Sequence, residues 1–84
     1  MGREPILDAR KNRIGYIETS ITGRSIIRDK MNRKLGELKP SGNRIEAYDA
    51  MLHKLGYYDK FRDATFDTMN KKLGKGNLLL NFFF

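Results

Sequence analysis

The stretch Asp29-Lys30-Met31-Asn32-Arg33-Lys34-Leu35-Gly36 decides the fold, because versions of it occur four times in a chain of 84 residues. Each copy has Asp, five residues of which the last is basic, an aliphatic residue and then Gly. The repeat anchors are Asp8, Gly15, Asp29, Gly36, Asp49, Gly56, Asp67 and Gly74. An internal repeat of this kind predicts that one small structural unit is built four times along the chain.

Two structures are compatible with the repeat. In a helical reading, Ile45, Tyr48, Leu52 and Leu55 fall at helical spacing, and each Gly would cap a helix after basic residues. The first copy argues against helices, because residues 8–13 carry no apolar stripe. We therefore prefer hairpins and keep a small helical repeat as the alternative.

In the hairpin reading, each Asp side chain accepts backbone N–H groups further along the chain and opens a type I turn. The third residue after Asp then needs a positive φ, as in hairpin loops with a bulge. Asn32 and Asn70 suit that conformation, whereas Lys11 and Leu52 fit it less well. Asn12, one position after Lys11, suggests a shifted first turn.

The residues that flank each turn favour strands, because they are rich in aliphatic and aromatic types. We predict an all-β single domain over 1–84, with four antiparallel hairpins around a pseudo-rotational axis. The predicted units are 4–18, 25–39, 44–59 and 63–76, followed by an apolar C-terminal segment at 77–84. The repeated Gly suggests an axis with no room for a side chain, and a closed ring of strands would protect the sheet edges.

With its Asp, turn, basic, aliphatic and Gly pattern repeated over nearly the whole chain, the sequence resembles the small bacterial β-flower proteins. Asn32 and Asn70 match the Gly or Asn that this family usually carries at the third turn position, and Lys11 and Leu52 depart from it. Residues 48–59 and 74–79 look most like the family. The resemblance implies four short hairpins around a pseudo-rotational axis, and it implies no activity.

Composition sets further limits. The chain has no Cys and a net charge of +7, so disulfides are excluded and polyanions are attracted. The start has no apolar run like that of a secretory signal, and no stretch approaches the ~20 apolar residues of a membrane-spanning helix. We therefore expect a cytoplasmic protein.

The turns hold nine of the seventeen Lys and Arg residues and no acid besides the leading Asp. If all four tips point the same way, they form a basic face that could bind nucleic acid through its phosphates. Tyr16, Tyr57 and Tyr58 are candidates for stacking on bases, or else belong to the core. The nine candidates for polyanion binding are Arg10, Lys11, Arg13, Lys30, Arg33, Lys34, Lys54, Lys71 and Lys72.

Nothing in the pattern predicts an enzyme, a metal site or a cofactor. The repeat Asp residues lie one per unit, where a turn needs a cap, and His53 occupies an ordinary turn position. Our main hypothesis is a non-enzymatic binding or assembly module, with nucleic-acid binding as the alternative. Its partner is an unknown protein or a second copy. Phe82, Phe83 and Phe84 are the candidate interface, because a free apolar end would expose a large patch.

Overall fold

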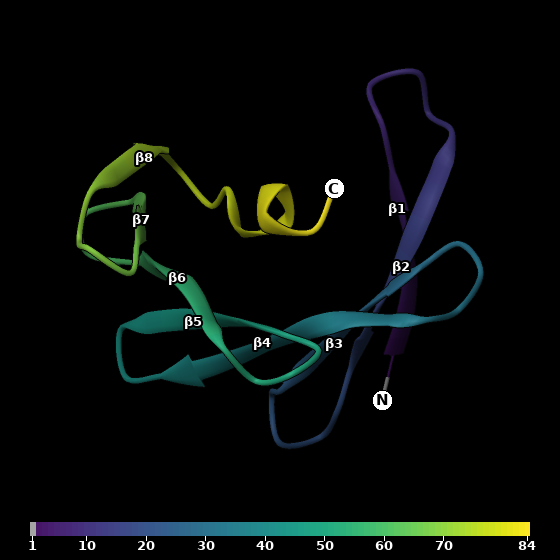
Figure 1. Ribbon diagram of the computed structural model, residues 1–84, viewed down its shortest axis with the longest axis horizontal. Coiled ribbons are helices and arrows are strands. Elements are labelled where there is room, and N and C mark those ends of the chain that lie inside the picture. The colour runs from purple at the N-terminus through teal and green to yellow at the C-terminus, as the bar shows by residue number, and fades with distance from the viewer. Residues whose placement is uncertain (1) are drawn as a thin grey trace.

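A computed structural model describes residues 2–84 and shows one antiparallel sheet of eight strands (Figure 1). The strands are β1 (Gly2–Leu7), β2 (Arg13–Thr19), β3 (Ser25–Asp29), β4 (Lys34–Ser41), β5 (Arg44–Asp49), β6 (Lys54–Asp59), β7 (Ala64–Asp67) and β8 (Lys72–Lys75). One short 3₁₀ helix, η1 (Leu79–Phe82), follows. The all-β prediction of four hairpins is confirmed, and the helical alternative is wrong because residues 2–84 contain no α-helix.

The four hairpin tips share one set of hydrogen bonds. In the tip between β3 and β4, the Asp29 carboxylate accepts the N–H groups of Met31 and Arg33 at 2.9 and 2.8 Å. The same two bonds form at the other three repeat Asp residues. These bonds satisfy backbone donors that a tight turn leaves unpaired, which explains why Asp is repeated.

All four third turn residues have the expected positive φ, at 66° for Lys11, 70° for Asn32, 67° for Leu52 and 63° for Asn70. The expectation of a shifted first turn at Asn12 is therefore wrong. Backbone bonds donated by the N–H groups of the repeat Asp and of the third turn residue recur at each tip, so they impose one conformation whatever the side chain. Lys11 and Leu52 adopt it at a cost in conformational energy.

Each hairpin also has a bulge next to its repeat Gly. In the pair β3–β4, Ile27 is opposite Gly36 and Arg28 is opposite Lys34, so Leu35 is the extra residue. The aliphatic residue before Gly is the extra residue in the other hairpins too. A bulge re-aims the side chain and increases local twist. Here it lets Ile14, Leu35 and Leu55 pack against the core.

The sheet is an open meander and not a closed ring. Its strand order runs from β1 to β8, and the two end strands do not pair with each other. The expected protection by ring closure is therefore wrong for this sheet. Pro5 lies within edge strand β1 and lacks an N–H, while the short edge strand β8 carries Lys72 and Lys75. Both devices discourage pairing with a further strand.

The core lies on the inner, concave side of the sheet, where the C-terminal segment crosses (Figure 1). Ile27, Ala47 and Leu79 are fully buried there. A second, smaller cluster on the outer side joins Tyr57, Ala64 and Phe66. The 77–84 segment, called the tail below, thus contributes core residues to a sheet that would otherwise have an open apolar face.

Candidate polyanion-binding surface and the C-terminal tail

The nine predicted tip cations fall into two groups. Arg33 pairs with Asp29 at 2.9 Å, Lys34 with Glu37 at 3.3 Å and Lys54 with Glu46 at 2.9 Å. Arg13 has no carboxylate partner but bonds the hydroxyl of Tyr16 at 3.0 Å. Within residues 2–84, the tip cations that are exposed and have no carboxylate or hydroxyl partner are Arg10, Lys11, Lys30, Lys71 and Lys72. These five are the ones available to an external anion.

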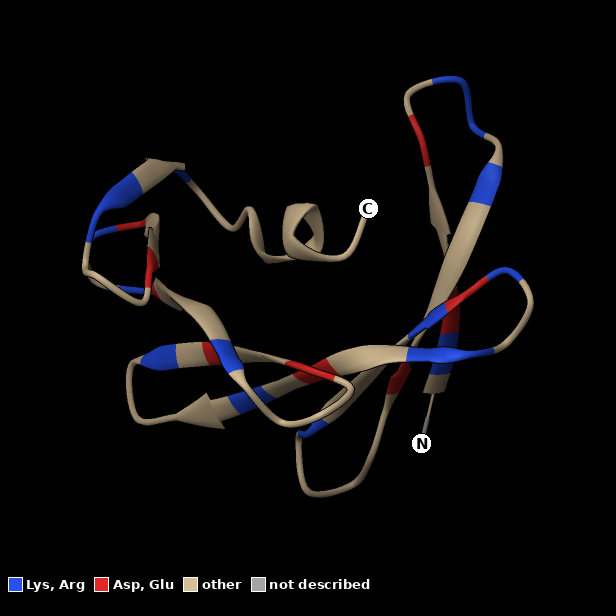
Figure 2. Ribbon diagram, in the orientation of Figure 1, with Lys and Arg blue, Asp and Glu red and all other residues tan. Residues whose placement is uncertain are grey.

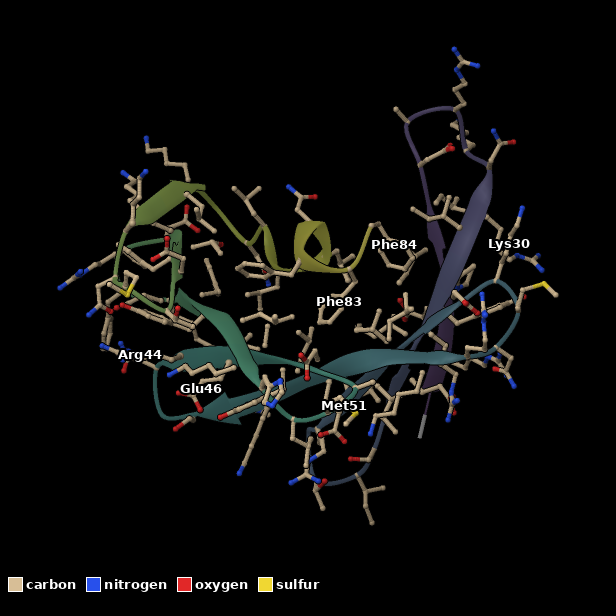
Figure 3. The ribbon with its side chains drawn as sticks, viewed as in Figure 1. Lys30, Arg44, Glu46, Met51, Phe83 and Phe84 are labelled. Atoms are coloured by element: carbon tan, nitrogen blue, oxygen red, sulfur yellow. The ribbon has the colours of Figure 1, made fainter. Side chains whose placement is uncertain are left out.

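The tips do not form a single basic face. Figure 2 shows Lys and Arg on the β1–β2 tip at the upper right, on the β3–β4 tip at the right and on β8 at the left. In Figure 3, Lys30 of the β3–β4 tip lies at the right, whereas Met51 of the β5–β6 tip lies near the lower centre of the molecule. The condition stated for a single face, that all tips point one way, is not met. A bound polyanion would have to contact neighbouring tips or wrap around the molecule.

Within residues 2–84, most acidic side chains form hydrogen bonds or ion pairs, whereas most cations form no ion pair. Five of the seventeen Lys and Arg side chains form ion pairs with carboxylates, at positions 28, 33, 34, 54 and 62. The other twelve have no such partner within residues 2–84. Of the ten acids, within the same residues, Glu4 alone has neither a hydrogen bond nor an ion pair. The net positive charge is therefore directed outward.

The outer side of the sheet adds cations that the repeat pattern did not reveal. The guanidinium of Arg3 lies 4.1 Å from the ring centre of Tyr16, and that of Arg44 lies 4.4 Å from that of Tyr57. Arg62 lies over Phe66 at 5.4 Å. The contact between Arg44 and Tyr57 follows from the sheet register. Glu46 is the cross-strand partner of Tyr57, and Arg44, two residues before Glu46, lies on the same face of the sheet. Such stacking holds the guanidinium planes in place.

The aromatic rings themselves do not offer a stacking platform of the kind considered from the sequence. Tyr57 is only 4 % exposed and is stacked on Phe66, with ring centres 5.3 Å apart. Tyr16 lies beneath two guanidinium groups, those of Arg3 and Arg13. Tyr58 packs against the inner core and donates its hydroxyl to Asp63 at 2.7 Å. Phosphate contacts, rather than base stacking, are the interaction that this surface could supply.

Hydrogen bonds also set the charge state of the turn acids. The N–H of Arg33 is the largest influence that lowers the pKa of Asp29 below its ordinary value, and its side chain adds to the effect. The N–H of His53 does the same for the pKa of Asp49. The side chain of Lys54 lowers the pKa of Glu46, which lies on the outer side. These carboxylates therefore remain ionised at neutral pH and hold their partners.

Two shallow hollows open on the outer side. The larger one, of about 290 Å³, is lined by residues that include Arg3, Glu18, Arg24 and Ile26. The second, of about 200 Å³, lies between Arg24 and the tip residue Leu52. The exposed Arg24 borders both hollows, so it is a further cation that the sequence reasoning did not single out.

The tail is packed into the repeat glycines, one residue per hairpin. A Cβ at Gly56 would meet the ring of Phe82 at 2.5 Å, and one at Gly74 would meet Leu78 at 2.6 Å. Phe83 occupies the same place at Gly36 and Phe84 at Gly15 (Figure 3 labels both Phe residues). The prediction that the repeat glycines leave no room for a side chain is confirmed, because side chains of the tail occupy the space beside them.

His53 and the repeat Asp residues do not converge. His53 lies exposed at its tip, with Nδ1 3.4 Å from the Asp49 carboxylate. The described residues, 2–84, contain no group of three or more His, Cys, Asp or Glu side chains able to hold a metal ion. Each repeat Asp instead binds the backbone of its own turn.

Three comparisons of the chain with known proteins gave no match. No family model, no curated protein and no solved structure matches it. Among residues 2–84, no helix is long and apolar enough to cross a membrane.

Proposed function

We propose that the protein is a non-enzymatic binding module that holds a polyanionic partner, with nucleic acid as the leading class. The proposal rests on the difference between the cations, most of which have no internal carboxylate partner, and the acids, most of which have an internal partner. Twelve cations lack a carboxylate partner within residues 2–84, whereas nine of the ten acids cap turns, bind a hydroxyl or pair with a cation. Cations without an internal carboxylate partner attract phosphates, and counterions condensed on a nucleic acid are released when such cations bind it.

The surface suits backbone contact rather than base reading. The free tip cations are exposed, and two outer-side guanidinium groups lie over aromatic rings. Lys and Arg contacts to phosphate fix position but carry no sequence information. We therefore expect similar affinity for mixed DNA and RNA sequences, and a steep fall in affinity as salt is added.

The test compares two variants of equal net charge. The first changes Arg10, Lys30, Lys71 and Lys72 to Gln, which removes free tip cations without breaking an ion pair. The second, the matched control, changes Arg24, Lys39, Lys60 and Lys75 to Gln, which are exposed cations outside the four repeat turns. Fluorescence anisotropy with a short labelled RNA and a short labelled DNA, at several salt concentrations, measures the Kd of each protein.

We expect the tip variant to lose affinity more strongly than the control, and to show a shallower dependence of log Kd on log salt. Equal losses in both variants would show that net charge alone matters, and would remove the tips from the proposal. Wild-type protein that fails to bind either nucleic acid at low salt would contradict the proposal as a whole. Circular dichroism of each variant establishes that the sheet is intact.

Two further assignments belong to this proposal. Membership of the β-flower family is supported by the four-hairpin sheet and by the Asn residues at the third turn positions of two units. A cytoplasmic location stays a prediction from the sequence. Expression of a tagged chain followed by cell fractionation tests the location, and a solved relative with the same hairpin arrangement would test the family.

A further inference from the structure

The tail contacts every hairpin, but it does so almost entirely through side chains. Leu78 covers Gly74 of the last hairpin, and Phe82, Phe83 and Phe84 cover the glycines of the third, second and first. Successive tail residues therefore contact the hairpins in the reverse of their order along the chain. Leu79 is fully buried and fixes the segment within the core.

Backbone bonds between the tail and the sheet occur only at its beginning. The buried Thr65 hydroxyl donates to the carbonyl of Gly76 at 2.8 Å and accepts the N–H of Leu78 at 2.9 Å. From Leu79 onward, the hydrogen bonds of the described tail stay within the tail itself. Residues 79–84 are thus held to the sheet by packing, and the same segment of another copy would offer the same contacts.

The chain entering the tail is built to change direction. Gly76 has φ of +77°, and no atom lies within 4 Å of the position that a Cβ would take there. Asn77, the next residue, is exposed. Since β1 and β8 do not pair, the tail can leave the concave side without any strand being unthreaded. Turning the chain at Gly76 and Asn77 breaks the bond from the Gly76 N–H to the carbonyl of Asp63, at 2.7 Å, and leaves the eight strands paired.

We propose that the tail exchanges between two copies of this chain, so that residues 78–84 of each copy fill the glycine positions of the other. The occupant of the vacated inner side is then a second copy, because its tail offers an identical set of side chains. Exchange conserves the Leu78–Gly74 and Phe–Gly contacts, and the closed monomer and exchanged dimer differ mainly in hinge geometry and association entropy. This self-association is separate from the proposed polyanion binding.

The direct test places a photoreactive group at the end of the tail. The para carbon of Phe84 is the ring atom that lies against Gly15, so a bulky para substituent would clash there, whereas the smaller diazirine side chain of photo-leucine at position 84 can lie beside Gly15 in place of the ring. The full chain is irradiated over a range of concentrations, and a mixture of isotopically labelled and unlabelled chains reports exchange. We expect covalent dimers of twice the 9.8 kDa chain mass, with adducts from position 84 of one copy to β2 or β3 of the other.

A hinge variant provides an independent measurement by light scattering. Gly76→Val is strained at positive φ but meets no neighbouring atom, so it destabilises the closed turn and should raise the dimer fraction. Gly76→Asn, which tolerates the same φ, is the control and should behave like the native chain. Because both copies carry a charge of +7, added salt should increase dimer formation, opposite to its effect on polyanion binding.

Adducts that remain within one chain at every concentration would overturn the proposal. Covalent dimers whose adducts map outside strands β2 and β3 would also overturn the proposal, since they would show a different interface. The hinge variant contradicts the exchange if Gly76→Val and Gly76→Asn both remain monomeric at concentrations at which their sheets are folded. The photochemical experiment stands even if Gly76→Val does not fold.

Discussion

The ring of Phe84 lies where a side chain at Gly15 would have to lie, 2.7 Å from the position that a Cβ would take. The two residues come from the end of the chain and from its second strand, so the contact joins the first hairpin to the tail. Phe83 at Gly36 and Phe82 at Gly56 repeat the relationship. The 3₁₀ helix Leu79–Phe82 ends with Phe83 as its C-cap, and the N–H groups of Phe83 and Phe84 both bond to the carbonyl of Leu80. Successive side chains in such a turn point about 120° apart. Consecutive Phe residues can therefore face three hairpins arranged around one axis.

Replacing Gly36 by Ala should destabilise the fold by about 1–3 kcal/mol, the usual cost of overpacking. The new methyl group would meet both the Phe83 ring and the carbonyl oxygen of Tyr48, and a backbone oxygen cannot move as a side chain can. Urea unfolding measures the free energy. Gly2→Ala is the control and should be neutral, because no atom lies within 4 Å of its Cβ position. Equal stability of the two variants would contradict the close packing described for Gly36.

Replacing Leu52 by Asn should stabilise the protein, because the backbone there has φ of 67° and Asn tolerates this conformation better than Leu. Recovery of part of the ~1–2 kcal/mol cost of a left-handed residue is expected. Lys11→Asn should act in the same direction, at φ of 66°. Thermal unfolding gives the change in Tm. Ala50→Asn, in the same turn but without positive φ, should bring no such gain, and an equal gain there would argue against the conformational explanation.

Acid should weaken the fold through the turn caps. The pKa values of Asp29 and Asp49 are lower in the folded chain than their ordinary value of 3.8, so the unfolded chain binds protons more readily. The stability that these caps provide is present above that ordinary value, and it is lost as the pH falls through the lower, folded pKa values. Urea unfolding at pH 7 and at low pH, at constant ionic strength, measures the loss.

The Asn variant separates charge from hydrogen bonding in this experiment. Asp29→Asn keeps an oxygen that can accept the N–H groups of Met31 and Arg33 but has no proton to gain. The decline in stability at low pH should therefore be smaller in Asp29→Asn than in the native chain. An identical decline in both proteins would show that other carboxylates, and not this cap, govern acid unfolding.

Removing the hydroxyl of Tyr57 should loosen the last hairpin. This nearly buried hydroxyl donates to the Asn70 side chain at 2.7 Å and so ties the third hairpin to the tip of the fourth. Tyr57→Phe should cost about 1 kcal/mol, the typical net value of one such bond. Hydrogen exchange at β7 and β8 and urea unfolding together measure the effect. Tyr58→Phe, whose bond to Asp63 is exposed, is the control and should cost less.

The relation between tips and preceding hairpins was not predictable from the repeat. The third turn residue of the second unit, Asn32, accepts a bond from Arg3 at 2.8 Å, and that of the fourth, Asn70, accepts one from Tyr57. Positive φ was expected at these positions from local turn chemistry. The long-range partners depend on how each hairpin is rotated against the one before it, which a local pattern does not specify.

The four hairpins, the capping Asp residues and the crowded glycines were predictable from the sequence, because turn chemistry and residue type act over a few neighbouring residues. The sequence also identified the cations, but it did not show that Arg33, Lys34 and Lys54 pair internally or that the tips diverge. Only the tertiary structure decided that the sheet stays open and that three Phe rings fill three glycines. These features depend on the rotation accumulated from hairpin to hairpin, and therefore on contacts between residues far apart in the chain.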